Sequence, residues 1–309
     1  MAVLFSSTMV DPNPWREAIQ AKSPGLDFRV FPEMGDPSEI EVSLAWRLPK
    51  GTFGQLTNLK LIYCTGAGVD QLFADPELPA DIPIVRIVDE RQADDMACFV
   101  MWAVFDHHRK LPLYRASQAK SEWLRGPIPT VSETRVGFLG LGALGAVAAE
   151  RLAICGFSVS GWTRTGRDIP GVESFVGDAE LDRFLAQTDC LVCLLPLTPQ
   201  TENILNRDLF AKLPKGASLV NVARGGHLVD ADLIEALDSG HLSGATLDVF
   251  REEPLPADHP YWTHPKIVIT PHIASLAKAG SVHAQVAENI RRLYAGEPLM
   301  NLVDRARGY

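Results

Sequence analysis

The stretch "RVGFLGLGALG", residues 135–145, decides the fold. It opens as a short apolar strand pattern, places glycines at 140, 142 and 145, and leads into a helical pattern over 143–154. In this G-x-G-x-x-G order the first glycine permits a tight turn, the second lets a pyrophosphate approach the backbone, and the third lets helix and strand pack closely. The helix N-terminus adds amide hydrogens for an anion. The predicted dinucleotide-binding loop comprises Gly140, Gly142, Ala143, Leu144 and Gly145.

Strand and helix patterns alternate on both sides of this loop. Strands are expected at 2–6, 42–46, 60–65, 82–88, 135–140, 157–162, 190–195, 217–223, 244–250 and 266–270. Helical patterns cover 91–111, 143–154, 178–187, 201–213, 231–239 and 280–295, and Pro112 is expected to end or kink the first. Such alternation is typical of parallel sheets. It predicts an α/β fold of two doubly wound parallel-sheet domains, Rossmann-like or flavodoxin-like, with the active site in the cleft between them.

The composition argues against several classes of protein. The 309 residues are 46% hydrophobic and carry a net charge of −9, so we expect binding to neither nucleic acid nor an anionic membrane. No signal-peptide pattern opens the chain, and no apolar run reaches the length of a membrane span. Five cysteines, an odd number, fit reduced thiols and a cytoplasmic protein. The CxxC spacing of "CLVC" at 190–193 lies inside a strand pattern, so we interpret these as core thiols and expect no metal site.

The tip of the second strand after the glycine loop points to the cofactor. NAD-binding units usually carry an acidic residue there for the ribose 2′-hydroxyl. This chain instead reads "GWTRTGR" at 161–167, with no acid before Asp168. Hydroxyl and guanidinium groups from Thr163, Arg164 and Thr165, with Arg167 beyond them, suit a 2′-phosphate. We therefore expect NADPH to be preferred, with NADH as the alternative.

Three chemically complementary residues each follow a predicted strand. Arg224 follows "ASLVNVA", Glu253 follows "GATLDVF" and His272 follows "KIVIT". Because parallel strands end at one edge of a sheet, these side chains are expected to meet where ligands bind. Arg224 can pair with a substrate carboxylate, His272 can donate a proton, and Glu253 can favour the charged imidazole. The set suits hydride reduction of a 2-keto acid, and the glycines after Arg224 are expected to keep the pocket open.

Other residues compete for these roles on spacing alone. Glu252 is as well placed in the sequence as Glu253. The rival imidazoles are His227, His259, His264 and His283, which we assign to surface or loop positions.

Four motifs together resemble those of one enzyme family. "GLGALG" at 140–145, "NVARGG" at 221–226, "DVFREEPLP" at 248–256 and "TPHIAS" at 270–275 are similar, in this order, to motifs of the D-isomer-specific 2-hydroxyacid dehydrogenases. The likeness includes "GAGVD" at 66–70 and covers nearly the whole chain. The resemblance implies an NADPH-dependent reductase of small 2-keto acids, glyoxylate and hydroxypyruvate first, with His272 as the proton donor.

The resemblance also implies residue roles. The catalytic positions are Arg224, Glu253 and His272. The substrate-binding positions are Trp46, which presents an aromatic ring, Ala67, Gly68 and Val69, whose backbone amides hold the carboxylate, and again Arg224 and His272. Further cofactor contacts are implied for Leu195, Pro196, Val222, Ala223, Asp248 and Ala274.

The family plan implies a discontinuous lid domain. Residues 1–97 and 285–309 would bind substrate, and residues 98–284 would form the dinucleotide-binding catalytic domain. Family members are typically homodimers, and the apolar helix at 95–105 agrees with an interface there.

Three alternatives stay open. The chain could reduce bulkier 2-keto acids, or it could be an NAD-dependent 2-hydroxyacid dehydrogenase. It could also be a non-catalytic, dinucleotide-sensing protein of the corepressor type, although the complete Arg, Glu and His set argues against that.

Overall fold

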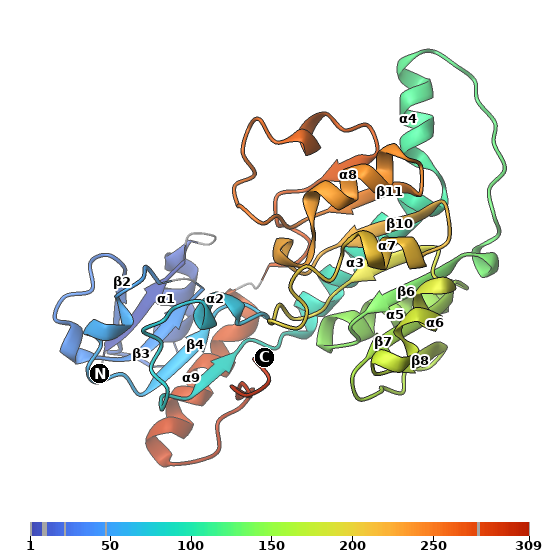
Figure 1. Ribbon diagram of the computed structural model, residues 1–309. Helices are drawn as coiled ribbons and strands as arrows, with labels where there is room; N and C mark the ends of the chain where they lie inside the picture. Colours follow the sequence, from blue (N-terminus) through green and yellow to red (C-terminus); the bar gives the residue numbers. More distant parts are fainter. Residues whose placement is uncertain (1, 8–10, 22, 47, 277–278, 309) are drawn as a thin grey trace. The chain divides into compact units, whose positions relative to one another are not determined.

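The computed structural model describes residues 2–7, 11–21, 23–46, 48–276 and 279–308, without the side chains of 279–281 (Figure 1). The chain folds into two compact units, Met1–Gln92 with Leu276–Tyr309, and Ala93–Ser275. The domain boundaries predicted from the sequence, 97/98 and 284/285, both lie later in the chain than the boundaries of these units. They fall inside helices α3 (Glu90–His108) and α9 (Ala279–Ala295). Among the described helices, none has the length and apolar character needed to cross a membrane.

The first unit is built on a five-stranded parallel sheet of order β2-β1-β3-β4-β5. Its strands are β1 (Ala2–Ser6), β2 (Asp27–Val30), β3 (Ile40–Ala45), β4 (Leu61–Cys64) and β5 (Ile84–Arg86). Consecutive apolar residues point to opposite faces of this sheet. Helices α1 (Pro12–Gln20) and α9 supply Trp15, Ile19, Val282 and Val286 to the apolar cluster on one face. The loop and helix around α2 (Asp70–Phe73) supply Val69 and Leu72 to the cluster on the other.

The second unit is built on a seven-stranded parallel sheet of order β12-β11-β10-β9-β6-β7-β8. Its strands are β6 (Arg135–Leu139), β7 (Ser158–Thr163), β8 (Val172–Val176), β9 (Cys190–Cys193), β10 (Ala217–Asn221), β11 (Leu242–Leu247) and β12 (Ile267–Ile269). The chain runs from β6 outward to β8, then returns to β9 on the other side of β6. The carboxyl ends of β6 and β9 therefore flank the switch point at which open α/β sheets bind ligands.

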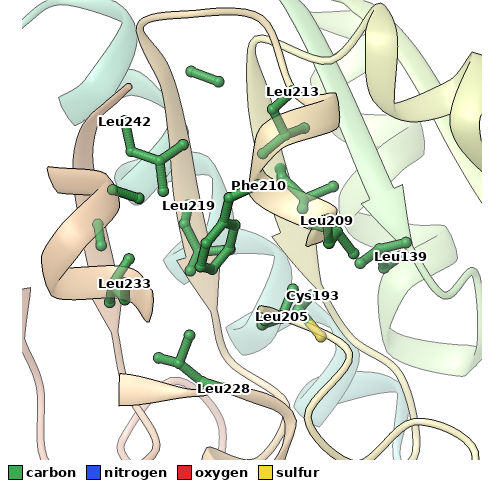
Figure 2. Close-up of a cluster of buried hydrophobic side chains, with 14 of the residues drawn as sticks. Leu139, Cys193, Leu205, Leu209, Phe210, Leu213, Leu219, Leu228, Leu233 and Leu242 are labelled. Carbon is green, nitrogen blue, oxygen red and sulfur yellow. The ribbon is translucent and has the colours of Figure 1, made fainter. Parts of the chain in front are cut away.

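Both faces of this sheet are covered by helices. Leu139, Leu191 and Leu219 face one cluster, drawn in part in Figure 2. The same cluster takes residues from α6 (Asp178–Ala186), α7 (Arg207–Lys212) and α8 (Asp230–Asp238). Their strand neighbours Phe138 and Val220 face a second cluster, which includes α3 and α5 (Ala143–Ile154). The predicted doubly wound α/β class is confirmed in both sheets.

Several elements differ from the sequence expectation. Strands β2 and β8 were not predicted; both lie at a sheet edge, and each has a single buried residue, Phe28 and Phe175, so neither shows a continuous apolar run. The helix expected at 201–213 is shorter, because Asn206 caps α7 by accepting a hydrogen bond from the Leu209 amide at 3.0 Å. Helix α3 ends at His108, and Pro112 lies in the first turn of a further helix, α4 (Leu111–Ala119). Proline suits a first turn, where its missing N–H costs nothing.

Candidate active site at the carboxyl edge of the second sheet

The glycine loop between β6 and α5 has the geometry that a pyrophosphate requires. Gly140 has φ +97°, and a Cβ there would lie 2.9 Å from the Leu194 carbonyl oxygen. A Cβ on Gly145 would lie 2.3 Å from the Gly140 carbonyl oxygen, so helix and strand meet only because glycine is present. A Cβ on Gly142 would meet no described atom within 4 Å, so space is open at the helix N-terminus. The residues present therefore fit a dinucleotide.

The residues predicted for the 2′-phosphate lie at the end of β7 and in the turn after it, where two of them make contacts that shape the turn and two are exposed at its tip. The Thr163 hydroxyl accepts a hydrogen bond from the Gly166 amide at 2.9 Å, which closes the turn. The Arg167 guanidinium donates to the Leu141 carbonyl at 2.6 Å and so ties the turn to the glycine loop. Arg164 and Thr165 are exposed at the tip. Thr163 and Arg167 shape the turn that presents these two side chains.

His272 and Glu253 form a hydrogen-bonded pair. Nδ1 of His272 lies 2.8 Å from Oε2 of Glu253, and the Phe250 amide donates to Oε1 at 2.9 Å. Burial raises the pKa of Glu253, but the hydrogen bonds from His272 and Phe250, with the charges of His272 and Arg224, hold it below its ordinary value overall. Glu253 is thus kept as a carboxylate, and Arg224 lies close enough to act on it. The structure brings the three predicted residues together.

Asp248 holds the loop that carries His272. Its carboxylate accepts from the Thr270 hydroxyl at 2.7 Å and from the amides of Ile273 and Ala274, each at 2.9 Å. His272 has φ +55°, a conformation that costs energy for a residue with a Cβ. Burial raises the pKa of Asp248, while these hydrogen bonds act in the opposite direction. The carboxylate implied as a cofactor contact therefore anchors the loop that carries His272.

The glycines after Arg224 bring two loops together, and the expectation that they keep a pocket open is wrong. A Cβ on Gly225 would lie 1.9 Å from the Phe250 carbonyl carbon and 2.2 Å from the Arg251 nitrogen. A Cβ on Gly226 would meet the Leu197 side chain at 2.9 Å. Gly225 thus lets the loop after β10 lie directly against the loop after β11.

Three further residues fix these loops and were missed in the sequence. Buried Asn221 donates to the Arg224 carbonyl at 3.1 Å and accepts from the Ala223 amide at 3.2 Å. Arg251 donates to the Leu228 carbonyl at 2.6 Å. His227, assigned to the surface or a loop, is fully buried in its loop, with its ring nitrogens 3.1 Å from the Arg224 carbonyl and 3.3 Å from the Pro196 carbonyl. The motifs "NVARGG" and "DVFREEPLP" contain the first two, but spacing alone does not identify their partners.

The comparisons with known proteins agree with this geometry. Residues 101–274 match the family model described as D-isomer specific 2-hydroxyacid dehydrogenase, NAD binding domain. The chain belongs to the D-isomer specific 2-hydroxyacid dehydrogenase family. It is 37% identical to a glyoxylate/hydroxypyruvate reductase A of Yersinia enterocolitica and 39% identical to one of Salmonella newport, each over 100% of both chains.

Two solved members of the 2-hydroxyacid dehydrogenase family share the whole fold. The enzyme from Xanthobacter autotrophicus Py2 in complex with NADPH and MES has TM-score 0.94 and 44% identity, covering 100% of this chain and 99% of that one. The NADPH-dependent glyoxylate/hydroxypyruvate reductase from Sinorhizobium meliloti, in complex with NADP and sulfate, has TM-score 0.93 and 37% identity, covering 100% of both. These relatives agree with the dinucleotide fit of the glycine loop.

The remaining predicted cofactor residues of this 2-hydroxyacid dehydrogenase also follow strands of the second sheet. Leu195 and Pro196 follow β9, Val222 and Ala223 follow β10, and Ala274 follows β12. The two cysteines of "CLVC" are buried on opposite faces of the sheet, Cys190 in one cluster and Cys193 in the other. Burial raises the pKa of each thiol to about 12. They cannot act as a vicinal pair, because i and i+3 in a strand point to opposite sides.

The predicted substrate residues of the first unit lie together. The Trp46 ring packs on Gly66, since a Cβ there would lie 1.8 Å from a ring carbon. Ala67, Gly68 and Val69 follow in the same loop, after β4 and before α2.

Proposed function

We propose that this chain reduces small 2-keto acids, glyoxylate and hydroxypyruvate first, with NADPH. The observation that carries the proposal is the His272–Glu253 pair at 2.8 Å, on which the charge of Arg224 also acts. A cation, a carboxylate and an imidazole held together beside a dinucleotide loop suit proton transfer to a carbonyl oxygen. The similarity to reductases of this substrate class supports the same assignment.

Each side chain has a distinct part in the proposed reaction. Arg224 binds the substrate carboxylate and stabilises negative charge on the keto oxygen. Because Nδ1 of His272 is engaged by Glu253, Nε2 is the nitrogen that delivers the proton to that oxygen. NADPH, when bound, supplies the hydride to the carbonyl carbon and leaves as NADP⁺. The amides of Ala67, Gly68 and Val69 and the ring of Trp46 are proposed to position the substrate.

The cofactor preference is proposed to rest on the exposed tip of β7. Arg164 and Thr165 offer a guanidinium and a hydroxyl there, and the segment 161–167 at the end of β7 contains no acidic residue. A 2′-phosphate suits Arg, whereas a ribose hydroxyl alone gives it no anionic partner. Leu195, Pro196, Val222, Ala223 and Ala274 are proposed to line the rest of the dinucleotide site.

The test is a set of initial rates with glyoxylate, hydroxypyruvate, pyruvate and phenylpyruvate, each with NADPH and NADH. We expect the first two with NADPH to be fastest, and His272→Ala to lose about 10²–10⁴-fold, as for removal of a general acid. His264→Ala is the matched control, because His264 pairs with Asp238 at 3.3 Å, away from the pair. Absence of turnover with every combination would favour the dinucleotide sensor instead.

The same assay tests the cofactor assignment. Arg164→Ala should raise KM for NADPH by about tenfold or more, the loss expected for one charge-assisted contact, and change KM for NADH little. An equal change for both cofactors would place the 2′-phosphate elsewhere.

We further propose that residues 93–275 form the catalytic domain, that the other unit is the substrate-binding lid, and that the protein is a cytoplasmic homodimer. None of the five cysteines, all of which lie in the described part of the chain, forms a disulfide, which suits a reducing compartment. The proposed dimer face includes the exposed Trp102 of α3 and the exposed Leu113 and Trp123 in and after α4. Helix α4 and the segment that follows it project from the rest of the second unit in Figure 1. Sedimentation at micromolar concentration should give twice the 33.8 kDa chain mass.

A further inference from the structure

Two side chains hold the carbonyl groups of the loop at 66–70 in the first unit. Arg86 Nη1 donates to the Ala67 carbonyl at 2.9 Å. The Cys64 thiol donates to the Gly68 carbonyl at 3.2 Å. Cys64 and Arg86 are register partners on β4 and β5, so their side chains leave the same face of the sheet beside the loop.

These two contacts determine where the next amides point. In a trans peptide the N–H is directed opposite to the C=O of the same plane. With the Ala67 carbonyl turned toward Arg86, the Gly68 amide points away from Arg86. With the Gly68 carbonyl turned toward Cys64, the Val69 amide points away from Cys64. Neither amide donates to a backbone carbonyl in the part of the chain that the structure describes.

The environment of Arg86 is not explained by a role in folding alone. Burial lowers its pKa, and no carboxylate among the described residues pairs with it. A partly buried guanidinium without an acidic partner is costly, because its hydration is lost without full compensation. A neutral side chain could fill the same space at lower cost, so folding alone does not explain the arginine.

We propose that Arg86, assisted by Cys64, is a positioning residue for substrate binding. It orients the 67–69 peptides so that the Gly68 and Val69 amides converge on the substrate carboxylate. The nearby guanidinium also adds positive potential to the loop. The inference rests on the proposed function, since it assumes that this loop binds the carboxylate of a keto acid.

The experiment is glyoxylate saturation with NADPH for Arg86→Met, Arg86→Lys, Cys64→Val and Cys64→Ser. Arg86→Met should raise KM for glyoxylate by about tenfold or more, with kcat changed less than about threefold and KM for NADPH unchanged, because a charged hydrogen bond is lost. Arg86→Lys keeps a donor and should recover part of the loss. Cys64→Val should raise KM for glyoxylate by only about threefold, because a thiol is a weaker donor than a guanidinium. Cys64→Ser keeps a donor at this position and should stay near wild type.

Arg305→Met is the matched control. Arg305 is also partly desolvated in the first unit and donates to backbone carbonyls, those of Pro79 and Ile82, away from the 66–70 loop. Arg305→Met should lower the melting temperature and leave KM for glyoxylate within about twofold, because contacts far from the 66–70 loop affect stability but not substrate binding.

Three results would overturn the inference: an unchanged KM in Arg86→Met, equal losses in Arg86→Met and Arg86→Lys, or the same KM increase in Arg305→Met. Each requires an active wild-type enzyme, so none can be confused with failure of the proposed function, which would remove turnover from the wild type itself.

Discussion

At the scale of single residues, the site depends on which atoms of Glu253 are occupied. One carboxylate oxygen binds His272 and the other accepts from the Phe250 amide. The backbone bond fixes the carboxylate, so the imidazole is held in one orientation. Glu252, its neighbour, is exposed, and the carboxylate that bonds to Nδ1 of His272 is that of Glu253.

Glu253→Gln should change the pH dependence of reduction. Glutamine can keep the hydrogen bond to His272 but lacks the charge that stabilises the protonated imidazole. The alkaline side of the pH profile of kcat/KM should therefore move toward lower pH, the direction expected when a nearby negative charge is removed. The measurement is the pH profile of kcat/KM with glyoxylate.

Glu252→Gln is the control for that substitution and should leave the profile in place. If Glu252→Gln moved the profile and Glu253→Gln did not, the catalytic carboxylate would have been misassigned.

Because the pKa of Glu253 is lowered in the fold, the stability that its contacts contribute is present above the ordinary carboxyl pKa and is lost as the pH falls through the lowered value.

At the scale of elements, the site is formed by the loops after β10, β11 and β12. The ends of these strands are in register, with Asn221 beside Leu247 and Leu247 beside Ile269. Arg251 crosses from the second loop to the carbonyls of the first. Gly225 makes that approach possible, so a small residue controls the distance between Arg224 and the Glu253 loop.

Gly225→Ala should therefore damage catalysis strongly. Its Cβ would collide with backbone atoms 1.9 and 2.2 Å away, and backbone cannot move aside without separating the two loops. A displacement of about 1 Å at a catalytic group can cost about 10²-fold in rate, so we expect a loss of that size in kcat/KM.

Gly226→Ala provides the matched comparison. Its Cβ would meet the far end of the flexible Leu197 side chain, which can change rotamer, so we expect an effect within about threefold. Equal losses in the two variants would show that the separation of the loops is not what Gly225 controls.

At the scale of the whole molecule, packing of α3 on the second sheet involves a buried titratable group. His107 of α3 lies 3.0 Å from the Thr246 hydroxyl of β11. Its ring also lies 3.2 Å from the position of a Cβ on Gly244. Burial lowers the pKa of His107 to about 4, although Asp106 acts in the opposite direction. His107 is therefore neutral in the folded protein across mildly acidic pH.

This predicts a loss of stability between pH 6.5 and pH 4. In that window the unfolded chain binds a proton at His107 and the folded chain does not, so the free energy of unfolding falls as the pH falls. His107→Gln, which can still bond to Thr246, should remove up to about 2–3 kcal/mol of this pH dependence. The check is guanidinium unfolding of both proteins across the window; parallel curves would mean that His107 is not the group responsible.

Local patterns predicted a large part of this fold. The glycine loop, the buried strands and most helices follow from turn sterics and hydrophobic period, which neighbouring residues determine. Edge strands β2 and β8 escaped prediction because each has only one buried residue, too few to give a recognisable apolar pattern. The end of α3 before Pro112 was predicted, but the new helix beginning there was not.

The sequence by itself determined the α/β class and the dinucleotide loop, and it predicted Arg224, His272 and an adjacent pair of glutamates as site candidates, since each belongs to a short motif with its own local chemistry. Only the tertiary structure decided that Glu253 and not Glu252 meets His272, that Asp248 anchors the histidine loop, that Gly225 serves a backbone contact, and that Arg86 reaches the Ala67 carbonyl. The physical reason is that these partners are distant along the chain. Strand order and register bring them within hydrogen-bond distance, and no local pattern records that proximity.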